Sequence, residues 1–174
     1  MYRYQVLIEY VGTKFVGWQK QLKGKSIQKE IENNLSKLLK QKITIYGSGR
    51  TDAGVHAIEQ SAHFDTKSKI QEIKKLIKSL NFFLNKKKIS IINIYNRKKK
   101  FHARFSAKVR VYKYYIINRL AAPSLENERA WHVRKKLDIK LLKKGAKKLI
   151  GTHDFSTFRA SNCYAKSPIK KINK

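Results

Sequence analysis

The sequence is short of cysteine, of acidic residues and of long apolar runs. Its one cysteine, Cys163, excludes an intrachain disulfide and indicates a reducing, cytoplasmic setting. No apolar run approaches the ~18 residues that span a bilayer, and no secretory signal opens the chain. Binding to a membrane surface is therefore a weaker interpretation than binding to a soluble polyanion. Because the five histidines are scattered without zinc-type spacing, we expect no metal site.

The scarcity of acidic residues favours one class of partner. Only 11 Asp and Glu accompany 41 Lys and Arg among 174 residues, a formal charge of +30. Coding bias toward Lys, Ile and Asn could explain many lysines as solvated surface, but it does not explain the shortage of acids. A polyanionic partner is the leading interpretation. A hydrophobic content of 41% is sufficient for a globular core in one large domain or two small ones.

Hydrophobic periodicity predicts six elements in the first 97 residues. Alternation predicts a strand over 2–11, and helical spacing predicts a helix over 26–40. The remaining elements are a strand at 43–46, a strand with Ile58, Gln60, Ala62 and Phe64 facing inward, a helix over 70–84 and a strand over 89–95. This β-α-β-β-α-β order predicts an α+β, ferredoxin-like unit whose sheet is mainly antiparallel, with both helices on one face.

The pattern restarts after the basic residues 97–100. A strand is expected from Val109 to Asn118, and a helix from about Asp138 to Ile150, where Gly151 supplies a stop. The boundaries are therefore 1–97 for the ferredoxin-like half with the glycine loop and 98–174 for a second half. This second half is C-terminally incomplete, because it has an opening strand and helix without the closing β-β-α-β.

The stretch "YGSGRTDAGVHA" (residues 46–57) places Asp52 in a glycine-framed turn. It matches neither the dinucleotide pattern G-x-G-x-x-G nor a P-loop, and an acid there would repel phosphate. Taken alone, Asp52 is most often a turn residue that caps its own backbone. Glycines that allow close approach of another chain, the neighbouring Arg50 and the basic surroundings favour instead a carboxylate that does chemistry in a nucleic-acid cleft.

Four blocks together resemble the tRNA pseudouridine synthase A family. They are "EYVGTKFVGWQKQ" (9–21), "GSGRTDAGVHA" (47–57), "FHARFSAKVRVYKYY" (101–115) and "GTHDFSTFRA" (151–160), in the order and spacing of that family. The resemblance covers nearly the whole chain. It implies a pseudouridine synthase fold, in which a second half follows the first.

The resemblance also implies a reaction and its residues. Family members detach uracil from C1′ of a uridine in tRNA, rotate it and rejoin it through C5, without a cofactor. Asp52 would be the catalytic carboxylate, as nucleophile or as base toward a sugar proton. Tyr112 would stack on the target base and assist proton transfer at C5, and Arg50 would help evict the nucleotide from the helix. The expected targets are uridines 38 to 40 of the anticodon arm, and a cytoplasmic homodimer is expected.

Other residues in the blocks have plainer interpretations. Gln19, His102 and Arg104 are candidates for the border of the RNA cleft, and Tyr112 could alternatively fill the core of an alternating strand. We expect Phe15 and Trp18 to pack in the core or a loop, and Asp154 to be a turn residue rather than a second acid. The lysine clusters at 86–88, 98–100 and 143–148 combine phosphate contacts with solvated surface.

The chain departs from the family near its end. Family members continue past "SPIKKINK" (167–174) with a segment that carries an arginine paired with the catalytic aspartate and an apolar residue packed on the base. We therefore expect a fragment, a truncated chain or the product of a shortened gene. A non-catalytic RNA-binding module, or an inactive truncated synthase, is the alternative to an active isomerase.

Overall fold

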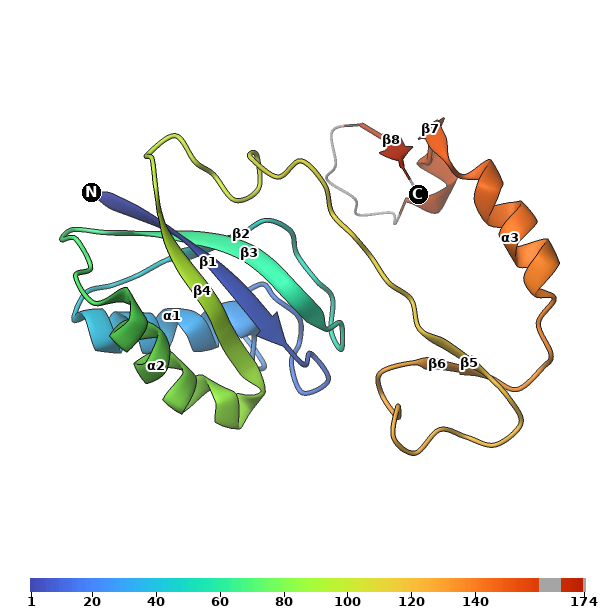
Figure 1. Ribbon diagram of the computed structural model, residues 1–174, viewed down its shortest axis with the longest axis horizontal. Helices are drawn as coiled ribbons and strands as arrows, with labels where there is room; N and C mark the ends of the chain where they lie inside the picture. The colour runs from blue at the N-terminus through green and yellow to red at the C-terminus, as the bar shows by residue number, and fades with distance from the viewer. Residues whose placement is uncertain (160–166, 174) are drawn as a thin grey trace. The chain divides into compact units, whose positions relative to one another are not determined.

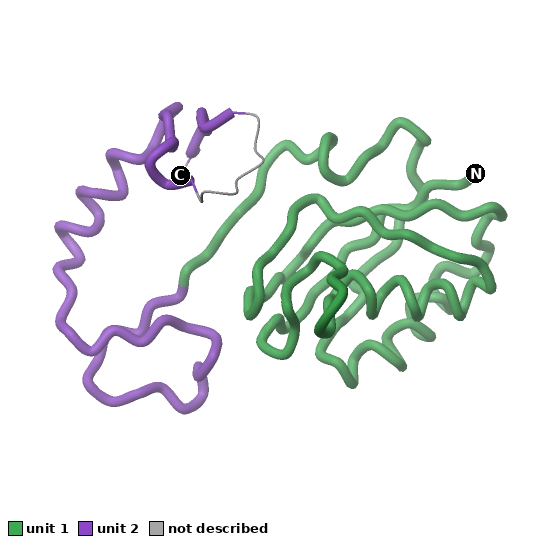
Figure 2. Tube along the Cα trace, turned by 180° about the vertical axis from the view of Figure 1, so that it is seen from behind, with its two compact units in different colours: residues 1–114 green, residues 115–174 purple. Residues whose placement is uncertain are grey.

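A computed structural model describes residues 1–159 and 167–173. The chain forms two compact units, residues 1–114 and residues 115–174 (Figure 2). The segment 98–114 thus belongs to the same unit as the first six elements, and the boundary expected after residue 97 stays a prediction. Cys163 and Ala160 lie outside the described residues.

The first unit is a four-stranded sheet with two helices on one face (Figure 1). Its elements are β1 (Tyr2–Tyr10), α1 (Ile27–Leu39), β2 (Ile45–Gly47), β3 (Ala57–Thr66), α2 (Ile73–Leu84), a short 3-10 helix (Asn85–Lys87) and β4 (Ile89–Arg97). The strands lie in the order β2-β3-β1-β4, and every neighbouring pair is antiparallel. The expected combination of helices with an antiparallel sheet is present.

The core lies between the sheet and the helices. Alternation in β1 buries Tyr4, Val6, Ile8 and Tyr10 on the helix side. Helix α1 begins at Ser26, whose side chain accepts a hydrogen bond from the backbone N–H of Lys29, and this satisfies one donor of the first turn. Phe15 and Trp18 are buried in the same core, which confirms their expected packing role.

Strand β3 departs from the predicted alternation at its start. Ile58 was expected on the inward face but is 66% exposed, whereas Ala62, Phe64 and Thr66 are buried. The reason is an irregularity in the ladder, because the pair Ile8–Gln60 is followed by Tyr10–Ala57, so three steps on β3 match two on β1. Such a bulge reverses which side chains face the core.

In its described residues, the second unit contains short strands, one α-helix and a 3-10 turn. Strand β5 (Ile116–Asn118) pairs in parallel with β6 (Trp131–Val133), and β7 (Gly151–Asp154) pairs antiparallel with β8 (Ile169–Ile172). Helix α3 (Ile139–Lys148) begins after Asp138, whose carboxylate accepts from the N–H of Leu141, and a 3-10 turn spans Ser156–Phe158. The helix was predicted, whereas β6, β7 and β8 were not, since three or four residues are too few to show a period.

The strand expected from Val109 to Asn118 is mostly absent. Only Ile116–Asn118 is strand, while residues 109–115 have no regular structure. Alternation indicates which side chains share a face, but a strand also needs a partner for its backbone, and no ladder pairs 109–115 within the described part of the chain. None of the helices described here is long and apolar enough to cross a membrane.

Candidate active site

The glycine loop (residues 47–56) connects β2 to β3. At its start, the N–H of Ser48 donates to the carbonyl of Ser61 at 2.8 Å, and the amide Nε2 of Gln60 donates to the carbonyl of Gly49 at 2.6 Å. Farther along, the N–H of Val55 donates to the carbonyl of Asp52 at 3.2 Å, and Gly54 adopts a φ of 79° that favours glycine. Asp52 therefore opens a tight turn in this loop.

The segment after β1 packs directly on the backbone of the glycine loop. A Cβ atom placed on Gly17 would lie 2.6 Å from the carbonyl oxygen of Thr51, and one placed on Gly12 would lie 2.0 Å from that of Val55. Both distances are below any normal carbon–oxygen contact. Only glycine at these two positions lets the chains approach as closely as they do.

Hydrogen bonds connect the same two segments. The N–H of Trp18 donates to the carbonyl of Thr51 at 3.0 Å, and the N–H of Gly12 donates to Nδ1 of His56 at 3.2 Å. The phenol of Tyr10 and the hydroxyl of Thr51 lie 2.8 Å apart. Burial raises the pKa of the Tyr10 phenol, so it stays protonated and bonded near neutral pH. The residues before and after Asp52 are thus held from one side.

Asp52 itself is exposed. Among residues 1–159 and 167–173, no hydrogen bond or ion pair involves its carboxylate, and the exposed Arg50 has no such partner either. Arg50 thus forms no ion pair with Asp52 in this structure. A rigidly supported turn with a free carboxylate is suited to react with a ligand rather than to stabilise the fold.

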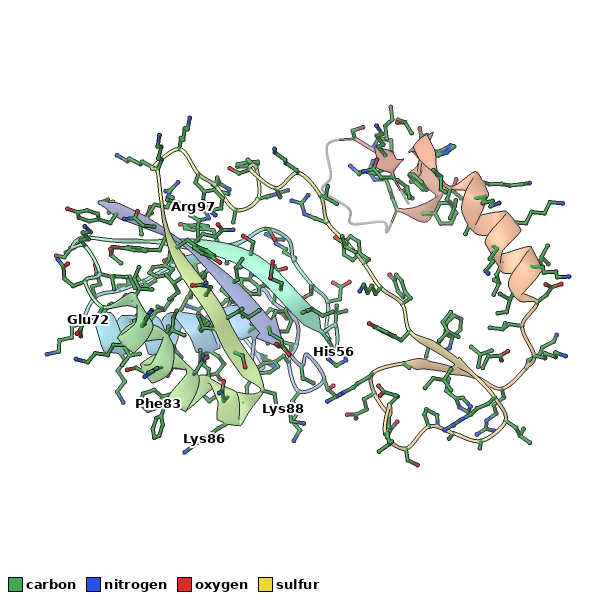
Figure 3. All side chains as sticks on the ribbon, viewed as in Figure 1. His56, Glu72, Phe83, Lys86, Lys88 and Arg97 are labelled. Atoms are coloured by element: carbon green, nitrogen blue, oxygen red, sulfur yellow. The ribbon has the colours of Figure 1, made fainter. Side chains whose placement is uncertain are left out.

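A crossing segment (residues 98–110) leads from β4 over the sheet face that the helices leave open. Arg3 on β1 forms an ion pair with Asp65 on β3 at 2.7 Å and also donates to the carbonyls of Lys99 and Phe101, at 2.8 and 2.7 Å. The hydrogen bond with Arg3 lowers the pKa of the Asp65 carboxyl. Figure 3 shows Arg97 and His56 at opposite ends of the sheet, so this segment starts at the end remote from the glycine loop.

The middle of the crossing segment lies on a buried histidine. The N–H of Ala103 donates to Nδ1 of His63 on β3 at 3.2 Å, and the ring of His102 lies 4.5 Å from that of His63. Tyr46 on β2 stacks on His63 at 5.2 Å. Burial, with smaller contributions from His102 and Arg3, lowers the pKa of His63 to about 4. His63 is therefore neutral at pH 7 and acts as an acceptor.

The crossing segment ends at the glycine loop. The guanidinium of Arg110 donates to the carbonyl of Ser48 through Nε at 3.3 Å and through Nη2 at 2.8 Å. Two residues later, Tyr112 is 71% exposed, so it does not fill a core as its alternative interpretation required. His102 is half-buried against Phe105, with ring centroids 4.4 Å apart, and Arg104 is exposed with its guanidinium over the Phe105 ring.

Three of the four sequence blocks meet in the first unit. Block 9–21 and block 47–57 pack backbone to backbone, and block 101–115 reaches the loop through Arg110. Gln19, which follows Trp18 in the chain, is half-exposed, and its side chain makes no hydrogen bond within the described residues. Block 151–160 belongs to the second unit, where Asp154 accepts from the N–H and the hydroxyl of Ser156 at 2.7 and 2.6 Å, as expected of a turn residue.

Sequence analysis missed Gly12, Gly17 and Arg110 as parts of the site. The two glycines were visible in block 9–21, but nothing local shows which backbone they approach. Arg110 precedes Tyr112 by two residues, a spacing that puts two side chains on the same side of an extended chain. No group of three His, Cys, Asp or Glu in the described residues could hold a metal ion.

Comparison with known proteins identifies the family. Residues 6–106 match the family model described as tRNA pseudouridine synthase. The chain is 70% identical over 172 residues to tRNA pseudouridine synthase A of Pelagibacter ubique (strain HTCC1062), covering 99% of this chain and 70% of that protein. It is 43% identical over 174 residues to the protein of the same name from Anaplasma phagocytophilum (strain HZ), covering 98% and 70%. The family model over residues 6–106 and the identity to these relatives place the chain in the tRNA pseudouridine synthase family.

Proposed function

We propose that this protein isomerises uridine to pseudouridine in the anticodon stem-loop of tRNA, at positions 38 to 40. The observation that carries the proposal is Asp52, whose carboxylate is exposed and without a partner in the described residues, in a turn that a second segment holds through two glycine contacts. The relatives named tRNA pseudouridine synthase A and the formal charge of +30 support an RNA substrate.

The chemistry needs a carboxylate close to the sugar of an extruded nucleotide. The C1′–N1 bond breaks, uracil rotates, a C1′–C5 bond forms, and the C5 proton is removed as N1 gains one. Asp52 acts as nucleophile or as base toward the sugar. Because the glycosidic carbon is buried in stacked RNA, the nucleotide must first be flipped out at a cost of a few kcal/mol. No cofactor takes part in this reaction.

The other site residues have supporting roles in this proposal. Tyr112 stacks on the flipped base and assists proton transfer at C5, which its exposed side chain permits. Arg50 occupies the place of the evicted nucleotide or contacts phosphate. Gln19, His102 and Arg104 line the border of the RNA cleft.

The proposal also covers the fold of the two halves and the oligomeric state. We infer that residues 1–97 form a ferredoxin-like half of a pseudouridine synthase fold, supported by the order β2-β3-β1-β4 with both helices on one face. Residues 98–174 then begin the second half. The working protein is a cytoplasmic homodimer.

Asp52→Asn tests the assignment. We expect this variant to lose isomerisation, measured as tritium release from C5-labelled uridine in tRNA, while its affinity for tRNA changes by less than about 1 kcal/mol, since the carboxylate serves chemistry rather than phosphate binding. Asp138→Asn is the matched control, because Asn caps a helix about as well as Asp. Appreciable turnover by Asp52→Asn would contradict the assignment of Asp52 as the catalytic carboxylate.

A second candidate function is RNA binding without catalysis. It is favoured by the segment that carries Tyr112, where Val109 and Val111 are 64% and 77% exposed and no sheet ladder in the described residues holds the backbone. Retained tRNA affinity together with a complete lack of tritium release from the wild-type chain would support this candidate against the isomerase.

A further inference from the structure

Arg110, at the end of the crossing segment, touches the glycine loop through its charged side chain. Its Nη2 donates both to the carbonyl of Ser48, at 2.8 Å, and to the carbonyl of Arg104, at 3.1 Å, while Nε donates to Ser48 at 3.3 Å. One guanidinium therefore joins the backbone of the loop to the backbone of the crossing segment.

The carbonyl that Arg110 contacts is itself held in place. The N–H of Ser48 donates to the carbonyl of Ser61, so Ser48 continues the pairing of β2 with β3. The chain then runs only four residues to Asp52, and Gln60 restrains the carbonyl of Gly49 on the way. A displacement of Ser48 would thus be passed to the turn that contains Asp52.

Tyr112 lies two residues beyond Arg110, the last residue of the crossing segment with a hydrogen bond to the glycine loop. Residues 109–115 have no regular secondary structure, so backbone ladders do not position them. In an extended chain, side chains two residues apart point to the same side. An extended course of the chain from Arg110 to Tyr112 would therefore carry the exposed side chain of Tyr112 out on the side of the glycine loop.

Arginine is suited to this task in a way that lysine is not. The planar guanidinium presents several N–H donors in a rigid fork, which can serve two carbonyls at once. A lysine would keep the positive charge but offers one flexible ammonium group. Charge and geometry can therefore be separated by a single conservative substitution.

We propose that Arg110 is a positioning residue for the isomerisation, which sets the placement of Tyr112 relative to the turn of Asp52 by joining the carbonyls of Ser48 and Arg104. The proposal rests on the proposed function. Arg110 touches neither base nor sugar in this role. Its removal lowers the rate because a misplacement of about 1 Å between reacting groups costs on the order of a hundredfold.

The test compares Arg110→Lys and Arg110→Ala with Arg119→Lys. Arg119 is a matched control, because it also donates to two backbone carbonyls, those of Ala121 and Ala122, but within the second unit. We expect both Arg110 variants to lose roughly a hundredfold in single-turnover tritium release at saturating tRNA. Dissociation constants for tRNA should stay within about threefold of wild type, with an unchanged salt dependence, because a guanidinium occupied by carbonyls neutralises no phosphate.

Three results of these rate and binding measurements would overturn the proposal. Recovery of the wild-type rate by Arg110→Lys, together with a salt slope in Arg110→Ala smaller by about 0.7 to 0.9, would make Arg110 a phosphate ligand. A wild-type rate in Arg110→Ala would leave it without a role. A rate loss in Arg119→Lys equal to that in Arg110→Lys would show a nonspecific effect.

A readout independent of catalysis separates this proposal from the proposed function. Hydrogen–deuterium exchange of peptides covering 47–57 and 105–115 should become faster in Arg110→Lys and stay unchanged in Arg119→Lys. A wild-type chain without tritium release would contradict the proposed function, and the exchange rates would then decide on Arg110 alone. Unchanged exchange in both Arg110 variants would refute the positioning role.

Discussion

Gly17 lies against the carbonyl oxygen of Thr51 so closely that a Cβ atom at position 17 would come within 2.6 Å of it. The N–H of the next residue, Trp18, donates to this same carbonyl. A loop after β1 and a loop after β2 thus share one backbone interface beside Asp52, and the geometry of the candidate site depends on a glycine more than 30 residues earlier in the chain.

Gly17→Ala should therefore reduce the rate. Its φ of 107° is unfavourable for an L-residue by ~1–2 kcal/mol, and the new methyl group must displace the chain at Thr51. A shift of about 1 Å in the turn of Asp52 would lower single-turnover tritium release on the order of a hundredfold.

Gly145→Ala in α3 is the control for this prediction. A Cβ atom there meets nothing within 4 Å, and alanine favours a helix over glycine by about 0.5–1 kcal/mol. We expect an unchanged rate and an equal or slightly higher melting temperature. A wild-type rate in Gly17→Ala would mean that the loop adapts without moving Asp52.

Salt should weaken tRNA binding steeply. With a formal charge of +30, log K is expected to fall by roughly 0.7 to 0.9 per phosphate neutralised for each tenfold rise in salt. Lys98→Ala and Lys99→Ala should each reduce this slope if their exposed side chains contact phosphate. Filter-binding titrations between 50 and 200 mM salt, roughly the range in which such effects are large, measure it.

Lys75→Ala is the matched control for the salt titration. Its ammonium forms an ion pair with Glu72 at 2.9 Å, so its loss should leave the slope unchanged. If the affinity of the wild-type protein for tRNA did not change with salt, the lysine excess would reflect coding bias rather than RNA binding.

His63 should make the fold sensitive to acid. Its pKa is about 4 in the folded protein, against an ordinary value of 6.5, because burial disfavours the charged ring. The unfolded chain therefore binds a proton first as pH falls, and stability is lost between about pH 6.5 and 4. The ion pair of Arg3 with Asp65 acts at lower pH, since the pKa of Asp65 lies below its ordinary value.

Melting temperatures of wild type and His63→Gln between pH 7 and pH 4 test this. The variant should be less stable at pH 7, because it loses stacking with Tyr46, and its melting temperature should fall less across this window. His153→Gln serves as the control, since this histidine is exposed. Parallel curves for wild type and His63→Gln would exclude His63 as the acid-sensitive group.

We expect the 174-residue chain to bind tRNA but to isomerise it slowly or not at all. Val109, Val111 and Tyr114 are exposed around Tyr112, and the relatives are longer, since the chain covers 70% of each. An extension with the C-terminal segment of such a relative should cover these side chains and raise the rate, whereas binding through many cations should change little. Equal tritium release by the two chains would show that residues 1–174 already form a complete site.

The sequence alone was sufficient to predict the first strand and the first helix, and its blocks named the candidate site residues. Alternation in 2–10 and helical spacing in 27–39 are properties of neighbouring residues, and these elements formed within one residue of their expected ends. Asp52, Arg50 and Tyr112 were likewise candidates from their motifs. Helix and strand periods depend on short-range geometry, which a sequence displays directly.

Tertiary structure decided what each element meets. The bulge that turns Ile58 outward, the missing partner of 109–115 and the contact of Gly17 with Thr51 all involve segments distant in sequence. The same holds for Arg110, whose spacing to Tyr112 was visible but whose target, the carbonyl of Ser48, was not. Hydrogen bonds and close backbone packing are satisfied in space, so local patterns identify the groups that need partners and only the folded chain selects the partners.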